Sequence, residues 1–140
     1  MRITIEIPTK ANIVNGGFEI KIAEESEEWN KSQLGDYAGK SGVYIHHSNG
    51  KILYIGKTTK GDWGNFGERL RRECQLRASR NSGLYQLLKS QNKPVYTYFL
   101  DLQDIDMMVD QGPMGLTSER KALIMEQILI GIFEPEGNRV

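Results

Sequence analysis

The chain has 140 residues, of which 39% are hydrophobic and 26% are charged, and its formal net charge at pH 7 is zero. This is the size and composition of one soluble globular domain with a single core. Its apolar runs fall short of the ~18–20 residues that a membrane span needs, and its single cysteine, Cys74, excludes an internal disulfide and a multi-cysteine metal site.

The first ten residues lack the layout of a secretory signal, because the acidic Glu6 interrupts their short apolar run. A single cysteine also suits a reducing compartment. We therefore expect a mature cytoplasmic protein that has no membrane partner.

The first 40 residues predict two short strands and an acidic loop. Arg2–Ile7 alternates with period two and is ended by Pro8, and Phe18–Ile22 alternates in the same way. We expect these two strands to pair as a hairpin with a long loop. Glu24–Asp36 is acidic and predicted to be irregular, with Trp29 as its one anchored residue. This part of the chain would extend the sheet or cover one of its faces, and we expect no catalytic residue in it.

The stretch from residue 41 to residue 58 predicts a β-hairpin. Val43–Ile45 and Ile52–Ile55 are rich in β-branched and aromatic residues, and between them lies Asn49-Gly50, which tolerates the positive φ angles of a type I′ turn. Each strand carries one tyrosine and is flanked by a glycine. A glycine at such a place lets another backbone or a phosphate come close.

The two histidines of the chain, His46 and His47, lie beside this turn. No cysteine or aspartate stands next to them, which argues against a zinc pair. Because neighbouring strand residues point to opposite faces, we expect at least one of the two to be solvated.

Two helices and a third strand are predicted to follow a glycine-punctuated loop. The first helix runs from about Asn65 to Ala78 and has Arg69 at the edge of its apolar face. The second runs from about Leu84 to Gln91, and Val95–Leu100 is a strand by composition. Asp101–Gly115 is predicted to be an acidic, mobile loop, in which residues 105–109 could form a helical turn.

The last predicted element is a helix from about Thr117, a good N-cap, to Phe133. At about 100° per residue, Glu126 falls in the middle of its apolar arc. A carboxylate there must be paired, protonated or bound to a metal, because an isolated buried charge costs several kcal/mol. A structural ion pair, for instance with Arg69, and a functional carboxylate both remain open. The arc consists of Ala122, Leu123, Leu129, Ile130 and Phe133.

The charge is distributed unevenly along the chain. Between Lys51 and Lys93 ten basic residues oppose three acidic ones, so this segment has a formal charge of +7 and the remainder −7. A cationic middle is expected of a protein with one phosphate-facing surface, although basic runs on exposed helices are also common. The candidates for nucleic-acid contact are Lys57, Lys60, Arg69, Arg71, Arg72, Arg77 and Arg80.

Gly42-Val43-Tyr44 followed by Tyr54-Ile55-Gly56 resembles the double motif of the GIY-YIG nuclease family. The order of the later elements is also similar: an arginine-bearing helix, a third strand, a glutamate-bearing helix, then a proline and an asparagine. The resemblance implies an α/β (α+β) fold with a small, mainly antiparallel sheet flanked by helices over residues 41–140. Residues 1–40 would form an N-terminal β-hairpin extension packed on the same domain.

The resemblance also assigns candidate site residues by position. Glu126 matches the family's single metal-binding glutamate, and Asn138 matches its terminal asparagine. The other matches are the motif tyrosines Tyr44 and Tyr54, the basic residue Lys57 after the second motif, and the helix arginine Arg69.

The chain departs from the family pattern in three places. The link between the tyrosines is slightly short, and about five extra residues around residues 60–64 separate the second motif from the arginine helix. Glu73 stands four residues after Arg69, where the family commonly has a histidine or tyrosine that assists proton transfer. Glu73 is therefore either a catalytic residue or a plain i,i+4 partner of Arg69.

The chemistry that the resemblance implies is metal-assisted hydrolysis of a phosphodiester. Glu126 would hold one Mg²⁺ (or Mn²⁺) ion, whose octahedral preference leaves places for water and a phosphate oxygen. Arg69 would donate to the phosphate oxygens. Tyr44 is the candidate general base, provided that Lys57, Arg69 or the metal lowers its pKa from about 10. Tyr54 would orient the water or bind the phosphate, and Asn138 would fix local geometry.

We therefore expect a divalent-metal-dependent endonuclease that acts on DNA, double-stranded or branched. The alternative is a catalytically inactive nucleic-acid-binding module of the same fold, which Glu73 and the zero net charge favour. A purely structural interaction domain would leave Glu126 unexplained.

Overall fold

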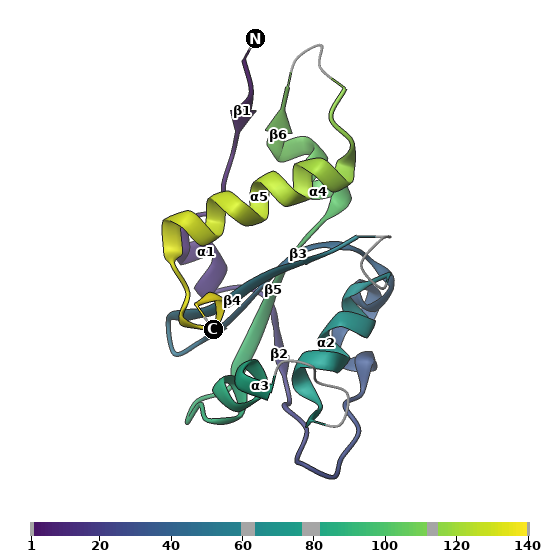
Figure 1. The fold of residues 1–140 in the computed structure, drawn as a ribbon, viewed down its shortest axis with the longest axis vertical. Helices are drawn as coiled ribbons and strands as arrows, with labels where there is room; N and C mark the ends of the chain where they lie inside the picture. The colour runs from purple at the N-terminus through teal and green to yellow at the C-terminus, as the bar shows by residue number, and fades with distance from the viewer. Residues whose placement is uncertain (1, 60–63, 77–81, 112–114, 140) are drawn as a thin grey trace.

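The computed structural model describes residues 2–59, 64–76, 82–111 and 115–139. Its centre is a four-stranded antiparallel sheet in the order β2-β5-β3-β4 (Figure 1). This mixed α/β architecture with a small antiparallel sheet is the predicted fold class. The strands are β2 (Phe18–Ile20), β5 (Val95–Asp101), β3 (Gly42–Ser48) and β4 (Lys51–Thr58).

The hairpin β3–β4 is confirmed, including its turn. Asn49 and Gly50 have φ angles of 52° and 77°, as a type I′ turn requires at both central positions. Strand β3 pairs with β4 on one side and with β5 on the other, so it is the most enclosed strand of the sheet. A register shift between His46 and His47 bends the hairpin near its turn.

Helices cover both faces of the sheet, and alternate residues of β3 point into two separate cores. Tyr44 belongs to the first core, which lies under α2 and α3, whereas Val43 and Ile45 belong to the second, which lies under α5 (Figure 1). The first face is covered by the 3₁₀ helix η1 (Lys31–Gly39), α2 (Phe66–Cys74) and α3 (Ser82–Lys89). The second is covered by α1 (Lys10–Val14), α4 (Leu102–Met108) and α5 (Ser118–Phe133).

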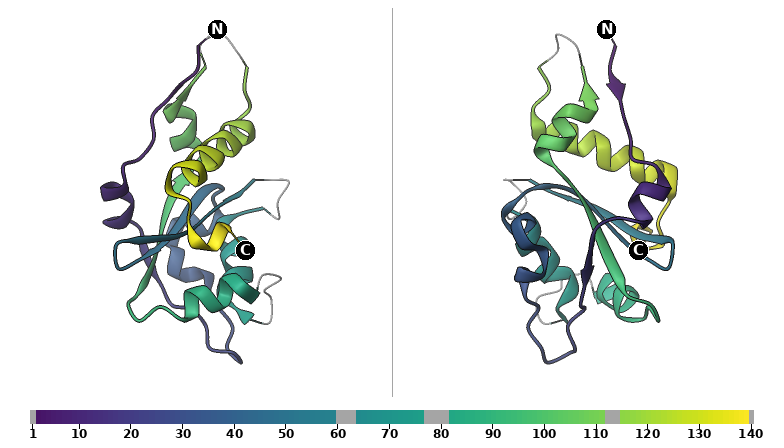
Figure 2. Two further views of the ribbon diagram at one scale, coloured as in Figure 1. Left: turned by 60° about the vertical axis from the view of Figure 1, so that its left-hand side comes forward. Right: turned by 180° about the vertical axis from the view of Figure 1, so that it is seen from behind.

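The two N-terminal strands form, but the prediction that they pair with each other is wrong. β1 (Thr4–Ile5) pairs with β6 (Val109–Asp110), and β2 pairs with the edge of β5. The connection contains helix α1, capped by the Thr9 side chain, so it carries β2 away from β1 along the back of the molecule (Figure 2). β2 extends the main sheet as expected. A boundary near residue 40 stays a prediction.

Helix α2 ends at Cys74, earlier than predicted. The N–H of Ala23 donates to the carbonyl of Cys74 (3.0 Å), and the N–H of Trp29 donates to the Gln75 side chain (2.8 Å). The first bond occupies the Cys74 carbonyl, which a longer helix would need for its own next turn. Gln75, which accepts the second bond, has an extended backbone. Residues 24–36, predicted to be irregular, thus support α2 and continue into η1, and Trp29 is buried as expected. The predicted continuation to Ala78 lies outside the described residues.

The segment after β5 begins with helix α4 rather than with the predicted mobile loop, and this helix includes most of residues 105–109, where a helical turn was the alternative. Asp101 and Asp104 form a capping box: the Asp101 side chain accepts from the N–H of Asp104 (2.8 Å), and the Asp104 side chain accepts from the N–H of Asp101 (3.2 Å). The buried side chain of Ile105 then packs α4 into the second core. The acidic residues that suggested a loop are therefore the start signal of α4.

Helix α5 has the predicted N-cap and nearly the predicted length, since the Thr117 side chain accepts from the N–H of Arg120 (3.2 Å). Its buried face differs from the predicted arc. Ala122, Met125 and Leu129 are fully buried, whereas Leu123 is 43% exposed. In the part of the chain that the structure describes, no helix is long and apolar enough to cross a membrane.

Candidate active site

The two motif tyrosines lie on the same side of the hairpin, and the second-motif glycine makes room for the first of them. Tyr44 is paired in register with Gly56, and Tyr54 with His46. A Cβ built on Gly56 would lie 2.5 Å from Cζ of Tyr44. The Tyr44 and Tyr54 ring centroids are 6.1 Å apart. The spacing of the double motif therefore places two aromatic rings and a side-chain gap at one site.

Helix α2 brings Arg69 and Glu73 against these rings. Its entry is fixed by Asn65, whose side chain accepts from the N–H of Glu68 (2.9 Å), and its apolar face is fully buried. The Tyr44 hydroxyl donates a short hydrogen bond to Oε2 of Glu73 and accepts one from Nε of Arg69 (3.2 Å). The same Arg69 nitrogen lies 3.5 Å from Oε2 of Glu73. Glu73 is thus both an i,i+4 partner of Arg69 and a direct partner of Tyr44.

His46 completes this cluster, although the sequence reasoning did not include it. Its Nε2 lies 2.8 Å from Oε1 of Glu73, and its Nδ1 lies 2.8 Å from Oγ1 of Thr97 on β5. The expectation that one histidine is solvated is wrong, because His46 and His47 are both buried. One signal was present: His46 stands two residues after Tyr44 on a strand, which places both on one face.

Burial dominates the acid–base behaviour of the tyrosines. Burial raises the pKa of Tyr44 well above its usual value, the charge of Glu73 raises it further, and Arg69 only partly opposes them. Burial and Glu73 also raise the pKa of Tyr54, while the charge of Arg69 and a hydrogen bond with it lower it. We expected Lys57, Arg69 or the metal to lower the pKa of Tyr44. The net effect of the protein's own groups is the opposite, because they raise this pKa.

Lys57 lies on the other face of the sheet. It is paired in register with Val43, a residue of the second core, and alternates with Gly56 along β4. Directly opposed residues of antiparallel strands share a face. The side chain of Lys57 therefore leaves the sheet on the face that α5 covers, not on the face that carries Tyr44. The residue is half-buried.

Glu126 is half-buried at the edge of the buried face of α5, which corrects the prediction that it lies in the middle of an apolar arc. Its Oε1 accepts from Nε2 of the neighbouring Gln127 (3.2 Å). Its charge raises the pKa of Tyr54, less than burial and Glu73 do. A partly hydrated carboxylate next to the cluster needs no buried counter-charge.

Asn138 fixes the edge strand β4. Its Oδ1 accepts from the N–H of Ile55, and its Nδ2 donates to the carbonyl of Ile55, both at 2.8 Å. Ile55 lies between Tyr54 and Gly56, so this pair of bonds holds the backbone of the second motif in the way that a further strand would. The geometry is that of the positioning role expected for Asn138.

The basic candidates are only partly described. Arg71 is partly exposed and lies 3.4 Å from Glu68, and Arg72 is half-buried. Lys60, Arg77 and Arg80 lie outside the described residues. Of the described cations of α2, Arg69 belongs to the cluster, whereas Arg71 pairs with Glu68.

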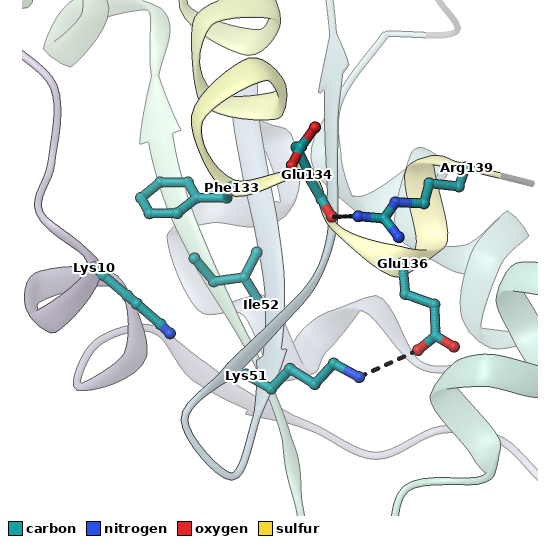
Figure 3. Close-up of a pocket in the computed structure, with 7 residues that line it drawn as sticks. All are labelled: Lys10, Lys51, Ile52, Phe133, Glu134, Glu136 and Arg139. Carbon is teal, nitrogen blue, oxygen red and sulfur yellow. Dashed lines mark hydrogen bonds and ion pairs between the residues drawn. The ribbon is translucent and has the colours of Figure 1, made fainter.

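A hollow of about 350 Å³ beside the hairpin turn is separate from this cluster (Figure 3). Lys51 lies 3.4 Å from Glu136 across it, and Arg139 donates to the carbonyl of Glu134 (3.2 Å). Three cations and two carboxylates line it, so its charges nearly balance. Its lining residues are Lys10, Lys51, Ile52, Phe133, Glu134, Glu136 and Arg139.

The donor set fits a magnesium ion better than a metal that needs a full protein cage. Among the described residues, no group of three or more His, Cys, Asp or Glu side chains could hold a metal together. Mg²⁺ keeps several waters and is commonly bound through one or two carboxylates plus substrate phosphates. A single half-buried carboxylate, Glu126, beside hydroxyl and guanidinium groups meets that requirement.

Fold and site together define a small antiparallel α/β domain with a tyrosine–carboxylate–guanidinium cluster on one face of its hairpin. The structure is similar to that of the GIY-YIG N-terminal endonuclease domain of UvrC from Thermotoga maritima. The magnesium-bound form is 21% identical, with 71% of this chain and 83% of that chain covered and a TM-score of 0.44. A tyrosine-to-phenylalanine point mutant, bound to the catalytic divalent cation, is 20% identical over 71% and 82% of the chains, also with a TM-score of 0.44. No family model and no curated protein matches the sequence.

Proposed function

We propose that this protein is a divalent-metal-dependent endonuclease of the GIY-YIG type that hydrolyses DNA phosphodiester bonds. The observation that carries the proposal is the convergence of Tyr44, Arg69 and Glu73 in one hydrogen-bonded cluster, with Tyr54 beside it and Glu126 within electrostatic reach of Tyr54. These residues are far apart in the sequence. Hydrolysis of a phosphodiester needs a proton acceptor, a fixed cation and a metal ligand. The cluster offers the first two in Glu73 and Arg69, and Glu126 is the candidate for the third.

Arg69 is the group that binds the phosphate. Its side chain is 31% exposed, so solvent and substrate reach it, while its Nε is fixed by Tyr44 and Glu73. The planar guanidinium has further donors for two phosphate oxygens. A preorganised cation of this kind stabilises the charge that develops on the phosphoryl group.

Tyr44 and Glu73 share the base function. The Tyr44 hydroxyl already donates to Glu73, so its proton has an acceptor, and the phenolate that remains accepts from Arg69. Tyr54 is less buried than Tyr44 and is within electrostatic reach of Glu126, which suits it to orient the attacking water. Glu126 would hold a magnesium or manganese ion, which lowers the pKa of bound water and neutralises phosphate charge when present.

The test is incubation of supercoiled plasmid with Mg²⁺, with Mn²⁺ and with EDTA. The proposal predicts nicking with either metal and none with EDTA. Glu126→Gln keeps the size of the side chain, removes its charge and should abolish nicking with little effect on stability, because the residue is half-buried. Glu119→Gln makes the same charge change at an exposed position of the same helix and should remain active. Full activity of Glu126→Gln would overturn the metal assignment.

The second candidate is a binding module of the same fold that binds nucleic acid without cutting it. One observation favours it: Tyr44 has no exposed surface, and burial and Glu73 hold its pKa high. A protein that binds DNA but cuts no plasmid with any metal would support this candidate. The cytoplasmic location expected from the sequence belongs to both candidates.

A further inference from the structure

The imidazole of His46 has no part in the function proposed above, although it is completely buried and both of its nitrogens have partners. Deepening that proposed function, we infer that His46 is a positioning residue, set by Thr97, that holds the Glu73 carboxylate so that its Oε2 receives the Tyr44 proton. The arrangement is a buried chain of four side chains: Thr97, His46, Glu73 and Tyr44.

The hydrogen bonds fix the proton positions along this chain. An ionised carboxylate only accepts. Oε2 of Glu73 accepts from Tyr44, and Oε1 faces His46, so Nε2 of His46 must carry a proton. In neutral His46 the other nitrogen, Nδ1, is then bare and accepts from the Thr97 hydroxyl. If His46 gains a second proton, Nδ1 donates to the same hydroxyl, which can also accept. Thr97 therefore satisfies both protonation states of the ring.

Glu73 requires such a holder because it is nearly enclosed. It is 5% exposed, so little water is available to satisfy Oε1 in place of the imidazole. A buried acceptor without a partner is costly, and rotation toward Arg69 would relieve that cost. Such a rotation would take Oε2 away from Tyr44. The Nε2–H of His46 holds Oε1 in place and so prevents that rotation.

The proton balance of the step is internal. The O–H bond of Tyr44 breaks, a new O–H bond forms at Oε2 of Glu73, and the Nε2 proton of His46 stays in place. The phenolate charge faces Arg69, and the carboxyl becomes neutral. The total charge of the cluster is therefore unchanged, which is favourable in a site shielded from water.

The groups around His46 come from four elements. Glu73 and, through it, Arg69 face the ring from α2, and Tyr44 precedes it on β3. The Tyr54 ring on β4 stacks on it, with centroids 6.0 Å apart and planes at 24°. Thr97 faces it from β5. These contacts hold the ring in one orientation, so its Nε2–H stays directed at Glu73.

The variants that test the inference either keep or remove the donor that faces Glu73. His46→Gln keeps a donor for Oε1 of Glu73 and should retain kcat within roughly tenfold. His46→Leu removes the donor and should lower kcat by roughly the 10²–10⁴ of general-base catalysis, with KM nearly unchanged. His47→Gln changes the neighbouring histidine outside the cluster and should leave the rate unchanged.

The deciding measurement is the nitrogen NMR spectrum of the His46 imidazole, which needs no cleavage. In the neutral ring of the wild type the proton should lie on Nε2, which faces Glu73, and Nδ1 should be bare. Glu73→Leu removes the acceptor, so the proton should move to Nδ1 and be donated to Thr97. A wild-type ring with its proton on Nδ1, the same tautomer in wild type and Glu73→Leu, or a fully active His46→Leu in an active wild type would overturn this inference alone. A wild type that cuts nothing would overturn the proposed function, whatever the spectrum shows.

Discussion

Tyr44 and Gly56 face each other across the hairpin, and the absent side chain of the glycine is what allows the tyrosine ring to reach α2. The hydroxyl then meets Glu73 and Arg69 at once. A single pair of opposed residues in the double motif therefore determines whether the cluster can form. This explains in steric terms why the motif needs a glycine at residue 56.

Gly56→Ala should displace the Tyr44 ring, because the new Cβ would lie 2.5 Å from Cζ of the tyrosine. A displacement of about 1 Å at a reacting group can cost on the order of 10²-fold in rate. We expect a loss of that size in single-turnover nicking by the folded variant. Gly131→Ala, in the last turn of α5 with open space around the new Cβ, should instead keep the rate and raise the unfolding free energy by up to about 1 kcal/mol. Equal rates for both variants would contradict the steric account.

At the scale of elements, the edge strand β4 is held by the C-terminal segment. Asn138 gives Ile55 both an acceptor and a donor at the point where the second motif lies. Gly137 packs against the same strand, since a Cβ there would lie 2.6 Å from the carbonyl oxygen of Leu53. The last turn of the chain thus takes the place of a fifth strand.

Asn138→Ala should lower the free energy of unfolding by about 1–3 kcal/mol, because it removes two hydrogen bonds worth about 0.5–1.5 kcal/mol each. Urea unfolding followed by tryptophan fluorescence would measure the change. Asn92→Ala, at an exposed turn position, should stay within about 0.5 kcal/mol of the wild type. A loss as small as that in Asn138→Ala would show that the C-terminal segment does not hold β4.

Local sequence signals predicted the elements that carry the site. The features that they did not predict depend on contacts between residues far apart in the sequence. The type I′ turn, the N-cap Thr117, the start of α2 near Asn65 and the order of elements follow from short patterns. The pairing of β1 with β6 could not be predicted in this way, because it joins strands about a hundred residues apart and depends on where α4 ends. The capping box of α4 was present in the sequence, but its second acid is an aspartate within an acidic run.

The same distinction applies to the candidate site. Tyr44, Tyr54 and Arg69, which the resemblance singled out, lie together, because each occupies a defined place on the hairpin or on α2. Glu73, which departs from the family pattern, joins them. His46 was missed because its partners, Glu73 and Thr97, come from two other elements. The burial of Glu126 was overestimated because helical spacing indicates the apolar side of a helix, whereas the sheet beneath it decides which part of that side is covered.

For the whole molecule, the zero net charge conceals a cationic middle segment, and DNA contact should depend on that segment. Affinity for a DNA duplex should fall linearly with the logarithm of salt concentration. Arg71→Ala should reduce the slope by about 1, whereas Arg120→Ala, in the first turn of α5 and outside the segment, should leave it unchanged. Fluorescence anisotropy between low and moderate salt would measure both slopes. An affinity that is independent of salt would indicate a protein or small-molecule partner instead.

The proposed function requires the buried Tyr44–Glu73 pair to supply the base of the cleavage reaction. Single-turnover nicking by Tyr44→Phe and Glu73→Gln tests this requirement. Tyr44→Phe keeps the ring and removes only the hydroxyl, so its rate should fall by roughly 10²–10⁴ with DNA affinity nearly unchanged. Because burial and Glu73 raise the pKa of Tyr44, the hydroxyl keeps its proton at neutral pH and passes it to Glu73 only during cleavage. Glu73→Gln removes the acceptor of that proton, so its rate should fall by a similar factor. A fully active Tyr44→Phe beside an inactive Glu73→Gln would assign the base to the carboxylate alone. A wild type that binds DNA and never cuts it would contradict the account.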